Sequence, residues 1–254
     1  MSIQSEEDIR QLQRIGQVVV AALRAMQAAL QVGMTTAELD AIGRQVLERY
    51  GAKSAPIHFY DYPAATCISI NEEAAHAIPG PRRICDGDLV NIDVSAILNG
   101  YVADTGASIP VGAVSPTAEK LCAAAQAALR AALKMAKAGN RMADMQQAIE
   151  KVARKEGFTV IENLCGHGVG RHIHEAPEYV PDYTRSKDRR RLQKGMVLTL
   201  EPFLSTGAHM AVEQGDGWTL ATQPGQLTAQ YEHTIIITER DPIIITKGAH
   251  GVDL

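Results

Sequence analysis

The sequence lacks the cysteine spacing that a disulfide framework or a structural zinc site requires. Its four cysteines are dispersed, and no two of them form a C-x-x-C pair. No apolar run approaches the roughly 20 residues of a membrane span, and the first residues, MSIQSEEDIRQ, lack the apolar core of a signal peptide. These absences predict a protein of the reducing cytoplasm with no membrane partner.

The sequence also lacks a large excess of charge of either sign. The net charge is −4 and the pI is about 6.1, so the chain as a whole does not attract DNA or anionic lipid. Apolar material, in contrast, is ample: 46% of the 254 residues are hydrophobic, enough for a sizeable core. Since we find neither a linker nor a low-complexity tract, we expect one domain over residues 1–254.

Two pairs of helices with matching glycine spacing are predicted. Apolar residues at helical spacing indicate a long helix over residues 6–31, and a capping box opens a short helix within the glycine-bounded segment 33–51. A long helix over residues 115–137 is again followed by a short one, within the equally spaced glycines of segment 139–157. Amphipathic helices also resemble one another by chance, but we favour two similar halves with a site between them.

A β-hairpin carries two aspartates. Asn99–Gly100 is a strong signal for a two-residue turn, and in that register Asp93 faces Gly106 while Asp104 faces Ser95. The two aspartates then share one face of the sheet, roughly 7–8 Å apart at the backbone. Two carboxylates on an apolar hairpin repel each other unless a cation lies between them. The alternative is the solvent-facing side of an antiparallel sheet.

Three further residues favour the cation. Glu232 lies in AQYEHTIIIT, which has the composition of a buried strand, and an unpaired buried carboxylate is costly. Glu201 ends the strand-like segment VLTLEP, and His167 lies between glycines in CGHGVGRHIHEAP. A lone histidine is more often a hydrogen-bonded core residue. Beside four acids, however, it completes an oxygen-rich set that suits a pair of divalent ions such as Mn, Fe or Co, which is a hydrolytic device.

Other catalytic signatures are missing. The sequence contains no H-E-x-x-H, no G-x-S-x-G and no P-loop, and the glycines around His167 do not match the dinucleotide fingerprint.

Six segments in this order resemble the signatures of the type I methionine aminopeptidases, over about residues 5–246: ATCISINEEAAHAIPG, LVNIDVSAILNGYVADTG, CGHGVGRHIHEAPEY, GMVLTLEPFL, GWTL and AQYEHTIIIT. The resemblance implies an α+β, pita-bread fold. In that fold two pseudo-symmetric halves of antiparallel strands, covered by helices, surround a central dinuclear metal site. It also implies a metal-dependent aminopeptidase that removes the initiator methionine from nascent proteins with a small second residue.

The resemblance assigns roles to residues at matching positions. It implies that two divalent ions (Mn, Fe, Co or Zn) are bound by Asp93, Asp104, His167, Glu201 and Glu232, with Asp104 and Glu232 as bridges. It further implies that His76 and His174 contact the substrate and stabilise the tetrahedral intermediate, and that Glu201 is the general base. The methionine pocket is expected near Phe59, Tyr62, Cys67 and Trp218. We expect His233 to point away from the site and to be structural.

The chain departs from the family at two places. Val102–Ala103 stand where relatives usually carry His-Gly, which puts the support of Asp104 in question. Ile173 stands where many relatives have an aromatic residue, which would loosen the pocket. The basic run 185–194 is a candidate for contact with ribosomal RNA, although a solvated loop is the favoured interpretation.

Two alternative functions remain open from the sequence. One is a proline-specific peptidase of the aminopeptidase P or prolidase type, whose members usually carry an additional N-terminal domain. The other is a non-catalytic binding protein of the same fold, which is disfavoured because buried acids without a ligand would be costly to keep. A monomer is expected.

Overall fold

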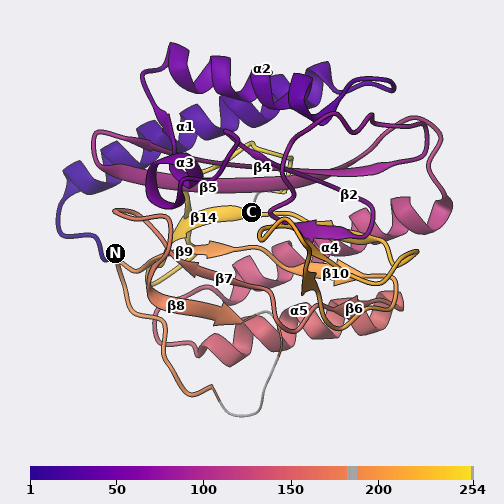
Figure 1. Cartoon of the computed structure of the whole chain (residues 1–254). Coiled ribbons are helices and arrows are strands. Elements are labelled where there is room, and N and C mark those ends of the chain that lie inside the picture. Colours follow the sequence, from indigo (N-terminus) through magenta and orange to yellow (C-terminus); the bar gives the residue numbers. More distant parts are fainter. Residues whose placement is uncertain (182, 184–187, 253–254) are drawn as a thin grey trace.

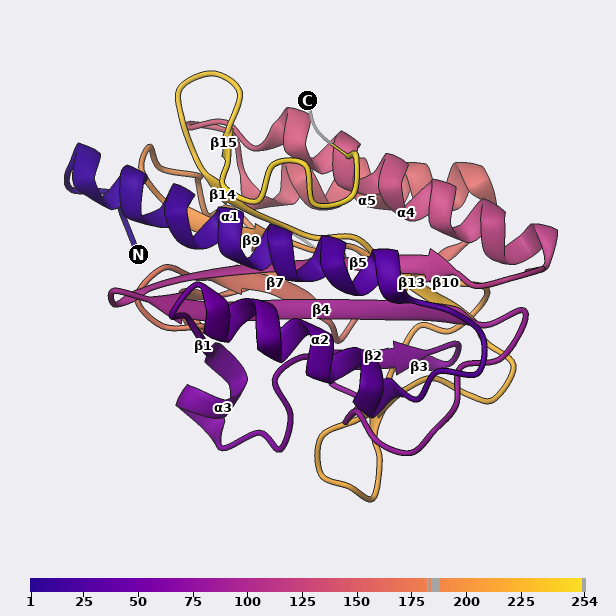
Figure 2. The ribbon, with the colours of Figure 1, turned by 90° about the horizontal axis from the view of Figure 1, so that it is seen from above.

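Antiparallel strands lie between two pairs of helices (Figure 1). The computed structural model describes residues 1–181, 183 and 188–252. The first pair is α1 (Glu6–Ala29) with α2 (Thr36–Arg49), and the second is α4 (Pro116–Met135) with α5 (Met142–Glu156); α3 (Ala55–Tyr60) is short. Seen from above, α1 and α2 lie along β4 and β5 (Figure 2). The predicted α+β architecture with helices covering the strands is confirmed.

The two short helices α2 and α5 begin in the same way. The backbone N–H of Thr35 donates to the carboxylate of Glu38 over 2.7 Å, and that of Arg141 donates to the carboxylate of Asp144, also over 2.7 Å. Each contact satisfies a donor that the first turn of a helix leaves without a partner. Gly157 closes α5 with a φ of 83°, in the left-handed region that favours glycine. The glycine-bounded repeat in the sequence therefore corresponds to two matching helices.

Every pairing between strands of the described residues is antiparallel. One sheet contains β1 (Lys53–Ser54), β2 (Cys67–Ile70), β4 (Leu89–Leu98) and β5 (Tyr101–Pro110). A second has the order β15 (Ile243–Ile244), β14 (His233–Ile236), β9 (Val197–Leu200), β7 (Cys165–Gly168), β8 (Glu175–Pro181). The two smaller sheets are β13 (Thr228–Gln230), β10 (Phe203–Ser205), β6 (Thr159–Val160), and β11 (Val212–Glu213), β12 (Leu220–Ala221), β3 (Glu73–Ala75).

The hairpin of β4 and β5 has the predicted register. Asn99 and Gly100 both have positive φ, 52° and 76°, as a two-residue turn of type I′ requires. Asp93 pairs with Gly106, and Ser95 pairs with Asp104. Because side chains alternate across a strand, both aspartates lie on the same face of the sheet.

The prediction of one continuous strand over residues 229–238 was wrong. β13 ends at Gln230 and pairs with β10, whereas β14 begins at His233 and pairs with β9, in another sheet. The segment that pairs with them is interrupted at the corresponding place, between the end of β9 at Leu200 and the start of β10 at Phe203. Glu232 and Glu201 lie in these two breaks, where the chain passes from one sheet to the other. The N–H of Glu232 donates instead to the carbonyl of Gly106, over 2.9 Å.

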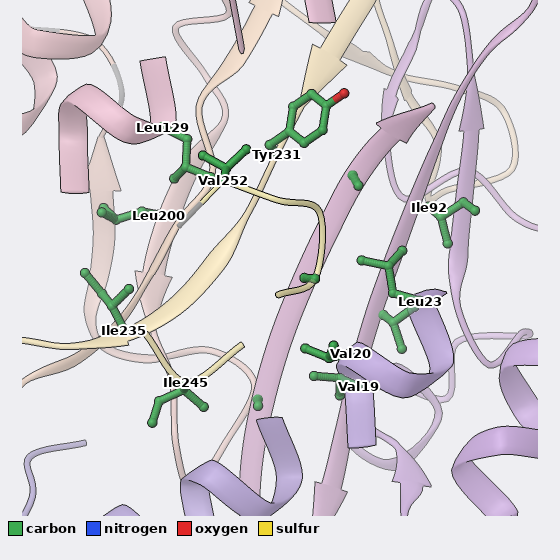
Figure 3. Packing of buried hydrophobic residues seen from close by; sticks show 14 of the residues in the cluster. Val19, Val20, Leu23, Ile92, Leu129, Leu200, Tyr231, Ile235, Ile245 and Val252 are labelled. Carbon is green, nitrogen blue, oxygen red and sulfur yellow. The ribbon is translucent and has the colours of Figure 1, made fainter. Parts of the chain in front are cut away.

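Buried aliphatic side chains join the helices to the sheets. On one side, Leu23 of α1 packs toward Ile92 of β4; on the other, Leu129 of α4 packs near Leu200 of β9 (Figure 3). Full burial of such a side chain contributes about 1.5–3 kcal/mol, so both helix pairs are held firmly against the strands that carry the acids. No helix of the described residues is long and apolar enough to cross a bilayer.

Candidate metal centre

The two hairpin aspartates are close enough to share a hydrogen bond between their side chains. Asp104 is buried and Asp93 half-buried. Burial raises the pKa of Asp93 to about 6. Burial also raises the pKa of Asp104, and the neighbouring carboxylates of Asp93 and Glu201 raise it further. Two ionised carboxylates are therefore unfavourable at this position, and a cation bound between them would offset their repulsion.

His167 and Glu232 complete a cluster with Asp104. One potential ligand atom from each of the three residues lies within 4.8 Å of the others. His167 Nε2 is 3.9 Å from Asp104 Oδ2 and 3.5 Å from Glu201 Oε1. Burial lowers the pKa of His167 to about 3, so the imidazole is neutral at pH 7, which is the form that binds a metal.

Two oxygen atoms of the cluster have no hydrogen-bond partner among the described residues. They are Oδ1 of Asp104 and Oε1 of Glu232, and both are buried. A buried polar atom without a partner is costly, so such atoms call for a ligand. Burial, followed by the charges of Asp104, Glu201 and Asp93, raises the pKa of Glu232. Converging carboxylates, one neutral imidazole and two unpartnered oxygens fit a pair of divalent cations.

Residues that the sequence analysis did not single out hold the acids in place. The hydroxyl of Thr199 accepts a hydrogen bond from His167 N over 2.9 Å and donates to Glu201 Oε1 over 2.6 Å. Gln230 Nε2 donates to Glu232 Oε2 over 3.1 Å. Thr199 and Gln230 each stand two positions before the glutamate that they support. This alternation, typical of a strand, is the signal that would have found them.

The Val102–Ala103 departure leaves Asp104 supported through its backbone. The hydroxyl of Thr234 accepts from Asp104 N over 2.9 Å and donates to Asp104 O over 2.8 Å. Val102 and Ala103 are buried, and the N–H of Val102 donates to the carbonyl of Gly170 over 2.9 Å. Apolar packing and these backbone contacts therefore stand where relatives usually have His-Gly.

A cavity of about 120 Å³ adjoins the cluster. Its wall brings together most of the residues expected at the site: Tyr62, Cys67, His76, Asp93, Asp104, His167, Ile173, His174, Glu201 and Trp218. Glu232 is fully buried behind this wall. Phe59 does not line the cavity, and its ring packs against that of His172 at 5.3 Å instead. His233 points away, with its ring nitrogens 2.8 Å from Thr246 Oγ1 and 2.8 Å from Val252 O.

The turn that carries His76 is held by polar contacts on both sides. His76 follows β3 and has a φ of 57°, a conformation that a residue other than glycine rarely adopts without support. The next N–H, of Ala77, donates to Ser69 Oγ over 3.3 Å, and the Tyr62 hydroxyl donates to the carbonyl of Ala77 over 2.9 Å. Burial lowers the pKa of His76 to about 4, so its ring is neutral at pH 7.

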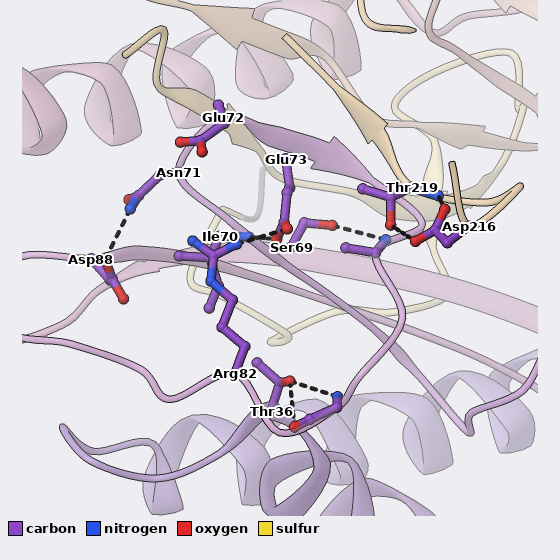
Figure 4. Close-up of polar contacts among 12 residues, drawn as sticks. Thr36, Ser69, Ile70, Asn71, Glu72, Glu73, Arg82, Asp88, Asp216 and Thr219 are labelled. Carbon is purple, nitrogen blue, oxygen red and sulfur yellow. Dashed lines mark hydrogen bonds and ion pairs between the residues drawn. The ribbon is translucent and has the colours of Figure 1, made fainter. Parts of the chain in front are cut away.

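Part of the cavity wall is apolar and contains sulfur. The rings of Tyr62 and Trp218 meet edge to face at 5.0 Å, and Cys67 lies beside them. Asp216 accepts hydrogen bonds from the N–H groups of Trp218 and Thr219, which fixes the turn (Figure 4). Aromatic edges and a thiol make favourable contacts with a thioether.

Comparisons with known proteins agree with this geometry. Residues 10–239 match the model of metallopeptidase family M24. Methionine aminopeptidase 2 of Bacillus subtilis is 45% identical, over 97% of this chain and 100% of the relative. The methionine aminopeptidase of Aquifex aeolicus is 38% identical, over 97% and 99%.

Solved structures give the same result. The crystal structure of methionine aminopeptidase from Thermotoga maritima matches with a TM-score of 0.93 and 34% identity, over 97% of this chain and 100% of that chain. The prolidase from Pyrococcus furiosus matches with a TM-score of 0.76 and 24% identity, and this chain covers 65% of it. That second similarity concerns the fold alone. It agrees with the predicted pita-bread architecture.

Proposed function

The chain belongs to metallopeptidase family M24 and, within it, to the methionine aminopeptidases, and we propose on this basis that it removes the N-terminal methionine from peptides and nascent chains whose second residue is small. The observation that carries the proposal is the position of the buried acids. They lie at the wall of a small cavity whose other side chains suit a thioether. Glu201 lines the same cavity, so a methionine side chain bound there would have its peptide bond near this acid.

Five residues would hold two divalent ions: Asp93, Asp104, His167, Glu201 and Glu232. The unpartnered oxygens of Asp104 and Glu232 support their place among these ligands. When bound, the ions would supply Lewis acidity that polarises the scissile carbonyl and makes a water nucleophilic at neutral pH. Mn, Fe, Co and Zn all suit such a ligand set.

Glu201 acts as the proton acceptor for the attacking water. The Thr199 hydroxyl holds one of its oxygens from 2.6 Å, which orients the carboxylate toward the cavity that it lines. A base that is already oriented needs no reorganisation during the reaction.

His76 and His174 act as hydrogen-bond donors to the substrate. Both line the cavity, and burial lowers the pKa of each. A neutral ring donates through one N–H, which can stabilise the oxyanion that develops on the carbonyl or the departing amide.

The two alternatives are less well supported. A proline-specific peptidase shares the fold, but the full-length relatives of this chain carry the methionine aminopeptidase name. A non-catalytic binding protein is disfavoured because the buried acids that converge here would be costly to keep without a bound cation.

The finer features of the proposal are a single catalytic domain, a monomer and a cytoplasmic location, where nascent chains occur. Contact with the ribosome through the basic run 185–194 is less favoured. Residues 185–187 lie outside the described residues. Further along, Arg190 pairs with Asp188, and Lys194 pairs with Glu239. These cations already have partners within the chain, which supports the solvated loop.

Peptide discrimination tests the proposal. The metal-loaded protein should release methionine from Met-Ala-Ser, release it much more slowly from Met-Leu-Ser, and leave Ala-Pro-Ala intact. Glu201→Ala serves as the inactive control. Cleavage of Ala-Pro-Ala alone would place the chain with the proline-specific peptidases, and cleavage of none of the three would refute catalysis on such peptides.

A further inference from the structure

Tyr60, to which the sequence analysis gave no role, contacts one of the two cavity histidines. Its hydroxyl oxygen lies 2.7 Å from Nδ1 of His174, and the two rings are 5.6 Å apart at a tilt of 38°. Tyr60 is the last residue of α3, whereas His174 comes immediately before β8. The contact therefore joins two segments that are far apart in the sequence.

The segment around Tyr60 is held at both ends. Ser54 caps α3 by accepting from the N–H of Ile57, and its own hydroxyl donates to the carbonyl of Ala65 over 2.8 Å. Asp61 ends the helix in the left-handed conformation, with a φ of 55°. Two residues after Tyr60, the hydroxyl of Tyr62 donates to the carbonyl of Ala77, beside the other cavity histidine. One short segment thus reaches both histidines from a fixed position.

The chemistry of the two groups gives the hydrogen bond its direction. The ring of His174 donates to a substrate in its neutral form, which carries a single N–H. The second ring nitrogen is bare and needs a donor. A phenol keeps its proton at neutral pH, and the burial of Tyr60 raises its pKa further. The side chain of Tyr60 is also 43% exposed, so its oxygen can accept from water while its O–H donates.

We propose that the Tyr60 hydroxyl donates to Nδ1 of His174 and thereby keeps the ring hydrogen of His174 on Nε2. With Nδ1 engaged, Nε2–H is the ring group that remains to donate to a substrate in the cavity. Tyr60 is then a positioning residue, because it sets the tautomer and the orientation of His174 without touching the reacting bond. This inference rests on the proposed function for its kinetic consequence, but the hydrogen bond itself does not depend on it.

Tyr60→Phe tests the kinetic consequence, because it removes the hydroxyl and leaves the ring that packs against His174. The loss of one neutral hydrogen bond should lower kcat for Met-Ala-Ser about three- to tenfold, with KM changed by less than about twofold. Tyr50→Phe is the matched control: Tyr50 is 52% exposed, at the end of α2, and its kcat should equal that of the unchanged protein. An equal kcat in Tyr60→Phe would overturn the inference.

Nitrogen-15 NMR of the metal-free protein tests the tautomer directly, since protonated and bare ring nitrogens resonate far apart. The signals of His174 are assigned from their loss in His174→Gln. The expected result is a bare Nδ1 and a protonated Nε2 in the unchanged protein, with a shift of this pattern in Tyr60→Phe and none in Tyr50→Phe. A protonated Nδ1 in the unchanged protein would overturn the inference. If the protein released no methionine at all, the proposed function would fail while this spectrum still decided the role of Tyr60.

Discussion

Replacement of Glu232 by glutamine should make the metal-free protein more stable. The carboxyl group of Glu232 is buried among three other acids, and one of its oxygens has no partner among the described residues. Glutamine has nearly the same shape and no charge, and its amide oxygen can still accept from Gln230. Most single substitutions destabilise a protein. A gain in stability in Glu232→Gln would therefore indicate that this buried carboxylate is unfavourable when no cation is bound.

The size of the gain follows from proton linkage. Burial raises the pKa of Glu232 in the folded chain, so the folded state binds the proton more tightly than the unfolded state does. The contribution of this proton to the free energy of unfolding is fully present below the ordinary pKa of about 4.3, and it is lost as the pH rises above that value. At about 1.4 kcal/mol per pKa unit, the raised pKa costs at most about 4 kcal/mol at pH 7, which lies roughly three units above the ordinary value. Glu232→Gln should recover much of that at pH 7 and almost none at pH 4.

Urea unfolding in excess chelator, at pH 7 and at pH 4, measures this difference. Glu213→Gln, which changes an exposed glutamate on β11, should have no effect at either pH. Added Mn(II) at about 100 times its Kd should stabilise the unchanged protein by about 2.7 kcal/mol and Glu232→Gln much less. If Glu232→Gln were no more stable than the unchanged protein at pH 7, or if its gain were the same at pH 4, the buried charge of Glu232 would not be what destabilises the metal-free protein.

Three further substitutions separate the roles within the site. Asp104→Ala should abolish both the second bound metal, measured by elemental analysis, and methionine release; normal turnover would contradict its place in the centre. His174→Ala should lower kcat by about 10²-fold or more and leave the metal content unchanged, so a loss of metal instead would assign it a different role. Thr199→Val removes the hydroxyl that holds Glu201 and should lower activity or metal affinity about 10- to 100-fold. If steady-state kinetics and metal titration of that variant were both normal, the hydroxyl would not be needed to orient Glu201.

The hairpin could be predicted in detail because its determinants are local. Asn99–Gly100 selects the turn, the turn sets the register, and the register puts Asp93 and Asp104 on one face. The matching helices α2 and α5 were also predictable, since their caps and glycines are local signals.

The breaks at Glu201 and Glu232 could not be read from composition. Residues 229–238 have the β-branched content of one strand, but their partners come from two different sheets, and strand propensity does not encode the partner. The contact between Tyr60 and His174 could not be predicted for the same reason, since it joins segments that only the tertiary fold brings together. Phe59 was expected in the pocket from family resemblance, and the orientation of α3 turns its ring toward His172 instead.

Methionine release from Met-Ala-Ser by metal-stripped protein, measured as Mn(II), Fe(II) or Co(II) is added back, decides whether the buried acids hold catalytic ions. We expect no release in excess chelator, release that rises with bound metal, and none at any metal concentration in Glu201→Ala. Full release in the presence of chelator would contradict this expectation, because the buried acids would then serve some purpose other than holding the ions of an aminopeptidase.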